Sequence, residues 1–93
     1  MMIGLLEIDL FAERFHSLKE KRRLLSSLKE RLKHKFNVAV AESDYQDLWQ
    51  KAQLSVVALG SDRSLLDGLF RQIEEFICLN YAVEISRLRV VFY

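Results

Sequence analysis

The sequence contains no proline, only three glycines and a single cysteine among its 93 residues. Without proline or glycine clusters, long loops and flexible linkers are not expected. A chain of this length builds one hydrophobic core but not two. The lone cysteine, Cys78, excludes an internal disulfide and suits a reducing compartment. We therefore expect one domain that spans residues 1–93.

Long hydrophobic runs are also missing. No apolar stretch approaches the roughly 18 residues that span a bilayer. The apolar N-terminal residues are interrupted by Glu7 and Asp9, and no basic segment precedes them, which argues against a signal peptide. The sequence thus predicts a cytoplasmic protein with no membrane partner.

The common catalytic signatures are absent as well, including GxGxxG, the Walker loop, HExxH and GxSxG. The two histidines, His16 and His34, would lie about 27 Å apart at the two ends of one helix, so they cannot share a metal ion. Cys78 has neither a CxxC partner nor a nearby histidine. We expect no catalytic residue, no metal, no cofactor and no small-molecule substrate, and hence a protein that is not an enzyme.

A helix over residues 17–36 organises the chain. Ser17 followed by Glu20 fits a capping box, in which the serine hydroxyl accepts from the backbone N–H of residue 20. Apolar side chains then recur at helical spacing and fall within about a third of the circle, as expected for a helix on a sheet. They are Leu18, Leu24, Leu25, Leu28, Leu32 and Phe36.

This helix also holds the surplus positive charge. Residues 17–36 contain eight Lys/Arg and two Glu, a net charge of +6, whereas the rest of the chain has a net charge of −5. Lines of such cations can neutralise nucleic-acid phosphates, and they can equally form a solvated helix face. The candidate phosphate contacts are Lys19, Arg22, Arg23, Lys29 and Lys33.

The remaining elements follow from apolar periodicity. We expect strands at residues 2–11, 37–43, 52–60 and 83–93, and a second helix from Ser61 or Asp62 to about residue 79. In the last strand the apolar phase changes after Ile85, so a bulge or a kink is expected near Ser86.

The order β-α-β-β-α-β with right-handed crossovers predicts a ferredoxin-like α+β sandwich, in which a four-stranded antiparallel sheet carries both helices on one face. The opposite face would remain open. Its expected residues are too apolar to be left comfortably in water, so a partner or a second copy could cover them. They are Ile3, Leu5, Phe11, Val91 and Tyr93.

Lys21 falls inside the leucine arc of the first helix. It could form an ion pair with Glu42, Asp44 or Asp47, or it could be directed at a phosphate. Those three carboxylates could also bind a hard cation, but no calcium-loop pattern surrounds them, and polar capping of a turn is favoured. Trp49 would then anchor the turn, or belong to an interaction surface if it is exposed.

Four stretches carry a resemblance to a known family: Gly4–Leu10, His16–Arg23, Phe36–Glu42 and Gln46–Ala52. Together they resemble the YlxP-like family of small bacterial proteins of unassigned function, over nearly the whole chain. The resemblance implies a ferredoxin-like fold in a cytoplasmic protein that is often encoded beside translation and ribosome-maturation genes. The family often has a histidine where this chain has Tyr45, which weakens the case for a metal ligand or general base at that position.

Two functional hypotheses follow. In the first, a non-enzymatic protein docks on ribosomal RNA or a ribosomal particle through the first helix. In the second, an uncovered sheet face or strand edge makes a homodimer, with no nucleic-acid role. The interaction surface that we expect for this hypothesis includes Phe11, Trp49 and Tyr93.

Overall fold

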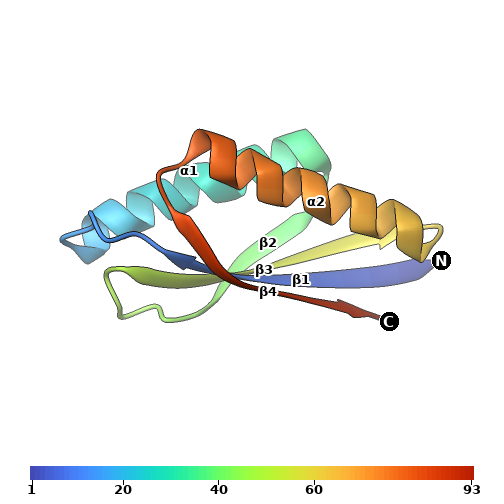
Figure 1. Cartoon of the computed structure of the whole chain (residues 1–93), viewed down its shortest axis with the longest axis horizontal. Helices are drawn as coiled ribbons and strands as arrows, with labels where there is room; N and C mark the ends of the chain where they lie inside the picture. The colour runs from blue at the N-terminus through green and yellow to red at the C-terminus, as the bar shows by residue number, and fades with distance from the viewer.

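Two helices and four strands make up the fold, in a computed structural model that describes residues 1–93. The elements are β1 (Met2–Phe11), α1 (Leu18–Phe36), β2 (Ala39–Asp44), β3 (Lys51–Gly60), α2 (Arg63–Asn80) and β4 (Glu84–Phe92). Both helices lie on one face of the sheet (Figure 1).

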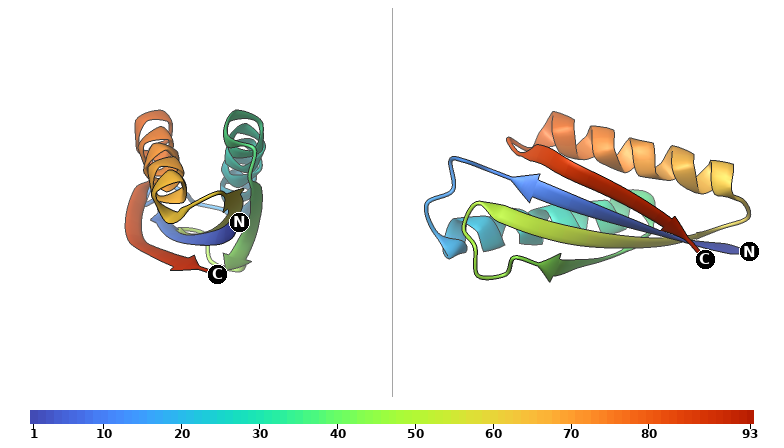
Figure 2. Two further views of the ribbon diagram at one scale, coloured as in Figure 1. Left: turned by 90° about the vertical axis from the view of Figure 1, so that its right-hand side faces the viewer. Right: turned by 60° about the horizontal axis from the view of Figure 1, so that its bottom comes forward.

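The strands form one sheet in the order β2-β3-β1-β4, and every neighbouring pair is antiparallel. The two helices run side by side above it, with α1 on the β2 side and α2 on the β4 side (Figure 2, left). The ferredoxin-like α+β sandwich predicted from the sequence is therefore confirmed.

The two ends of α1 are capped by local polar groups. The Ser17 hydroxyl accepts a hydrogen bond from the Glu20 backbone N–H at 3.2 Å, which is one of the two bonds of the predicted capping box. At the other end, Asn37 adopts a left-handed conformation with φ of 53°, and its N–H donates to the Lys33 carbonyl at 3.1 Å. Because Asn37 ends the helix, β2 begins at Ala39, and our expectation of a strand from residue 37 was wrong.

The core lies between the helices and the upper face of the sheet. Even-numbered β1 residues point into it beside α1 and α2, and Gly4 leaves room for the ring of Phe70. The most deeply buried side chains of the core are Leu6, Ile8, Leu28, Leu32, Leu54, Val56, Leu66, Ile73 and Ile77. Neither helix is long and apolar enough to cross a membrane.

One irregularity sets the phase of β4. The pairing of β1 with β4 shifts register between Asp9 and Leu10, which leaves Ser86 as the extra residue of a bulge. The shift places Ile85 on the helix-facing side together with Leu88, although their positions differ by three. The bulge predicted near Ser86 is confirmed.

Candidate nucleic-acid interface

On the side of α1 that faces α2, two cations pack against aromatic rings. The guanidinium of Arg31 donates to the Tyr81 hydroxyl at 3.1 Å and lies 4.9 Å from the centroid of the Phe76 ring. Lys35 lies 5.7 Å from the same centroid. The hydrogen bond and the two cation–π interactions join α1 to α2, so these two exposed cations already contact the neighbouring helix.

The five cations of α1 that were predicted to contact phosphate have no acidic partner. The protein has three ion pairs, namely Lys21–Glu42, His34–Glu30 and Arg89–Glu7. None of them includes the five residues predicted to contact phosphate. Four of the five are exposed and Lys29 is half-buried.

These cations form a line on the outer side of the molecule. Arg31 and Lys35 fix the direction of α2, and at 100° per residue Lys19, Arg22, Lys29 and Lys33 point away from it, toward the side on which α1 overlies β2. From Lys19 to Lys33 the line extends about 21 Å along the helix axis. We call these four residues with Arg23 the basic flank. It is a concentrated positive surface with no compensating carboxylate bound to it.

Lys21 is the one buried cation of α1. Its side chain is 1% exposed, and its ammonium donates to the carbonyls of Tyr45 at 2.6 Å and Leu48 at 2.7 Å. The Glu42 Oε2 atom lies 3.1 Å from the same nitrogen, so the predicted ion pair is confirmed. Oε2 is itself buried and accepts no well-aligned hydrogen bond, and its charge is therefore compensated only by Lys21.

The loop between β2 and β3 is held in place by these bonds. Tyr45 has a left-handed backbone with φ of 62°, and its carbonyl also accepts from the Leu48 N–H at 3.1 Å. Gln50 ties the loop to the β1–α1 connection, since its carbonyl accepts from the Ala12 N–H at 2.9 Å and its side-chain amide donates to the Glu13 carbonyl at 2.8 Å. The loop is a fixed part of the structure.

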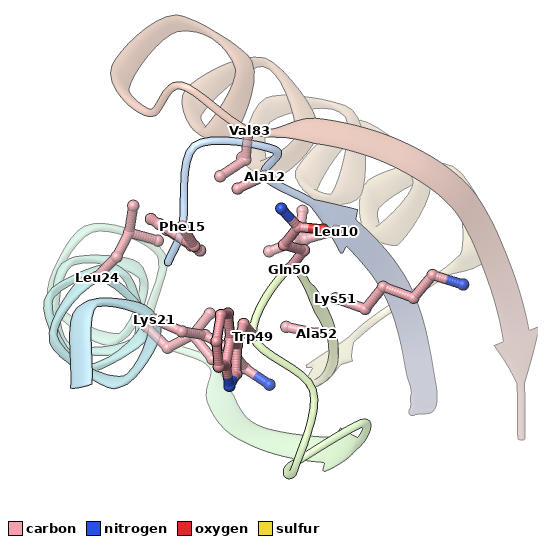
Figure 3. Close-up of a pocket in the computed structure, with 11 residues that line it drawn as sticks. Leu10, Ala12, Phe15, Lys21, Leu24, Trp49, Gln50, Lys51, Ala52 and Val83 are labelled. Carbon is pink, nitrogen blue, oxygen red and sulfur yellow. The ribbon is translucent and has the colours of Figure 1, made fainter. Parts of the chain in front are cut away.

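Trp49 sits on this loop with half of its surface, 53%, exposed. The other half helps to line a small cavity with Lys21, Phe15 and Leu24 (Figure 3). The cavity volume is about 10 Å³, which is at the lower limit for one water molecule and too small for an organic ligand. Trp49 is therefore both a packing anchor and an exposed aromatic surface.

The three residues of the predicted interaction surface lie in two places. Phe11 and Trp49 line one shallow depression, to which His16 also contributes. Tyr93 exchanges backbone hydrogen bonds with Ile3, eight residues along β1 from Phe11, which corresponds to about 26 Å. The open sheet face thus has an apolar end at Tyr93 that is separate from the Trp49 loop.

Asp44, next to the loop, serves a local role. Asp44 Oδ1 accepts from the Tyr45 N–H at 2.7 Å, which is the polar capping of the turn that the sequence suggested. Nowhere in the protein do three or more His, Cys, Asp or Glu side chains come together in a way that could hold a metal ion. Cys78 is exposed and unpaired.

Sequence reasoning named Glu42 as one of three possible partners of Lys21 but missed the two carbonyls that Lys21 binds. The available signal was the position of a lysine inside the leucine arc, together with the need of an ammonium for three acceptors. The left-handed turn at Tyr45 decides which backbone carbonyls act as these acceptors, and no residue pattern in the sequence predicts that turn.

The fold and its surfaces define a small ferredoxin-like α+β protein with one strongly basic helix. Residues 3–90 match the family model described as "Protein of unknown function (DUF503)", and the chain belongs to that family. The chain is 36% identical over 76 residues to "Uncharacterized protein YlxP" of Bacillus subtilis (strain 168), an alignment that covers 82% of this chain and 83% of the relative. The resemblance to the YlxP-like family is thereby confirmed.

A solved structure shows the same fold. The "De novo designed protein Ferredog-Diesel" superposes with a TM-score of 0.52 over 96% of this chain and 83% of its own, at 20% sequence identity. At this identity the likeness concerns the architecture alone.

Proposed function

We propose that this protein is a non-enzymatic RNA-binding factor that docks on structured RNA, such as ribosomal RNA within a ribosomal particle, through the basic flank. The observation that supports the proposal is that the charges of the basic flank form no ion pair within the chain. Five cations on one helix have no acidic partner, while the remainder of the chain outside residues 17–36 is net negative. An anion is the complement of this surface.

The physical basis is the release of counterions. Each Lys or Arg that neutralises a phosphate frees condensed cations into solution, and the logarithm of the affinity falls by about 0.7 to 0.9 per contact for each unit of log salt. Five contacts give a slope of about −3.5 to −4.5. Binding of this kind follows the shape of the backbone and does not read sequence.

The competing interpretation is a solvated helix face that promotes solubility. It predicts no salt-dependent binding to RNA. It also predicts that reversing charges on α1 changes RNA binding no more than reversing charges elsewhere. A pair of matched variants separates the two interpretations.

Arg22→Glu combined with Lys33→Glu reverses two exposed charges of the basic flank. Arg63→Glu combined with Arg71→Glu makes the same change of net charge on α2, where both arginines are also exposed. Binding of each variant to ribosomal particles and to a ribosomal RNA fragment would be measured from about 50 to 300 mM salt. Circular dichroism would verify that both variants keep the fold.

We expect the wild type to bind with the steep salt slope given above. In the flank variant the slope should become shallower by about 1.4 to 1.8 units, and the affinity should fall much more than in the α2 variant. Equal losses in the two variants, or no binding of the wild type at 50 mM salt, would refute the proposal.

A further inference from the structure

The sheet face that no helix covers is divided into an apolar end and a polar end. The cross-strand pairs Ile3–Leu59 and Leu5–Val57 occupy the apolar end, with Val91 beside Leu5 on β4. Leu59 is 63% exposed and Tyr93, next to Ile3, is 70% exposed. Contiguous exposed side chains of this kind mark an interaction surface.

The polar end of the face is nearly neutral. Arg89 pairs with Glu7 at 3.2 Å, and the Gln53 amide donates to Asp9 at 2.9 Å. Counting every charged residue that the register places on this face gives four carboxylates and three cations. They are Glu7, Asp9, Asp44, Glu84, Lys51, Arg87 and Arg89. Balanced charge does not suit a nucleic acid, but it does suit a surface that meets a copy of itself.

We propose that the open sheet face binds the same face of a second copy, in a homodimer whose two-fold axis runs parallel to the strands between β1 and β3. A two-fold axis in the plane of the interface can run along the strands or across them. Across the strands, it would set the apolar end of one copy on the polar end of the other. Along the strands, it sets apolar on apolar, and this is the arrangement that the division of the face requires.

The strand order determines which residues then meet. With the axis between the two central strands, β1 of one copy faces β3 of the other, so that Val57 faces the partner's Leu5 and Leu59 faces the partner's Ile3. The outer strand β4 faces β2 of the other copy. Arg87 shares its row with Asp9 and Gln53, and therefore faces the partner's Asp44.

Arg87 and Asp44 are suited to this contact because both are exposed and neither forms an ion pair within its own chain. The symmetry makes the Arg87–Asp44 contact twice in each dimer. The face is therefore complementary to itself both in its apolar rows and in its charges.

The area of the open face reaches the lower limit for a specific pair. Four strands at a spacing of about 4.8 Å, with a length of about 26 Å, present roughly 500 Å² of projected face in each copy. The pair thus buries at least about 1,000 Å², which reaches the size expected of a specific interface. Both basic flanks remain outside the interface, because α1 lies on the opposite side of the sheet (Figure 2).

The first test is sedimentation of the wild type and of single variants over a range of concentrations. The wild type should sediment as a dimer that dissociates on dilution. Val57→Asp should weaken the dimer by about a hundredfold or more, because each dimer would bury two unpaired carboxylates. Leu59→Asp, nearer the end of its strand, is a second variant with the same expected direction.

The matched control is Leu79→Asp, at an apolar side chain on α2 that is 82% exposed and faces away from the sheet. It should leave the dimer unchanged. A wild type that stays monomeric at about 0.5 mM would overturn the proposal, as would a control variant that dissociates as readily as Val57→Asp.

The second test is a charge exchange that examines the axis itself. Arg87→Asp and Asp44→Arg should each weaken the dimer by about tenfold, since each places like charges opposite one another twice. The double variant should return to within about threefold of the wild type. If the two losses simply add in the double variant, the assigned axis is refuted.

Discussion

Replacing Lys21 by methionine tests the buried ion pair directly. Methionine keeps an apolar side chain at the wall of the cavity that Trp49 also lines, and it removes the ammonium. The change leaves the buried Oε2 of Glu42 with no compensating charge, and the carbonyls of Tyr45 and Leu48 lose their donor.

The expected loss of stability follows from these lost interactions. Removing one partner of a buried ion pair destabilises a protein by about 3 to 5 kcal/mol. The Glu42 side chain is 18% exposed, which places the cost near the lower limit, at about 3 kcal/mol. A domain of this size has a total stability of about 5 to 14 kcal/mol. The loss is therefore a large part of the total, and Tm should fall by about 12 to 24 °C.

Urea unfolding followed by Trp49 fluorescence and by far-ultraviolet circular dichroism measures this loss. Trp49 is the only tryptophan and lines the same cavity as Lys21, so its emission reports on the loop. Its transition should precede that of the circular dichroism in Lys21→Met, because the loop loses its attachment before the sheet unfolds.

Combining Lys21→Met with Glu42→Leu removes both charges and should recover more than half of the lost stability. Only the Leu48 carbonyl then lacks a partner, because the Tyr45 carbonyl still accepts from the Leu48 N–H, and a surface loop can offer the Leu48 carbonyl to water. A loss of less than about 1 kcal/mol for Lys21→Met, or a double variant less stable than the single one, would refute the reasoning.

Three further substitutions, the last with a control, test local features of the fold by thermal unfolding. Gly4→Ala should cost about 1 to 3 kcal/mol, because the added Cβ would lie 2.9 Å from a ring carbon of Phe70; an unchanged Tm would contradict the close packing. Gly68→Ala on α2 should instead stabilise by about 0.5 to 1 kcal/mol, since nothing lies within 4 Å of the new Cβ, and a fall in Tm would count against this account. Ser17→Ala should cost about 1 kcal/mol through the lost cap of α1, whereas Ser26→Ala in the exposed middle of the same helix should not destabilise it.

The architecture could be predicted from the sequence because local and global signals agree. The leucine spacing of α1 and the alternation in β1 give each element a single buried face, and the order of the elements leaves one common topology. Even the bulge at Ser86 was visible, because Ile85 and Leu88 both need the core side of β4.

The errors arose where backbone conformation decides the outcome. Asn37 was assigned to a strand because apolar residues follow it, but its tolerance of the left-handed region makes it a helix cap. The left-handed turn at Tyr45, which aims two carbonyls at Lys21, has no comparable signature. The separation of Tyr93 from Trp49 follows from the strand register, which the sequence alone does not determine.

The position of β1 between β3 and β4 governs the order in which the protein can assemble. Gly4 on β1 pairs with Phe92 on β4, and these residues are 88 positions apart in the sequence. The pairs between β1 and β3 are closer in the sequence, and the most distant of them is Met2 with Gly60. On a translating ribosome, β1, α1, β2, β3 and α2 are all synthesised before β4, so a three-stranded sheet can form while one edge of β1 still has unpaired backbone groups. The docking of β4 closes the longest loop of the sheet and completes the pairing of β1. Until then, β1 presents an open edge that any extended peptide nearby could occupy.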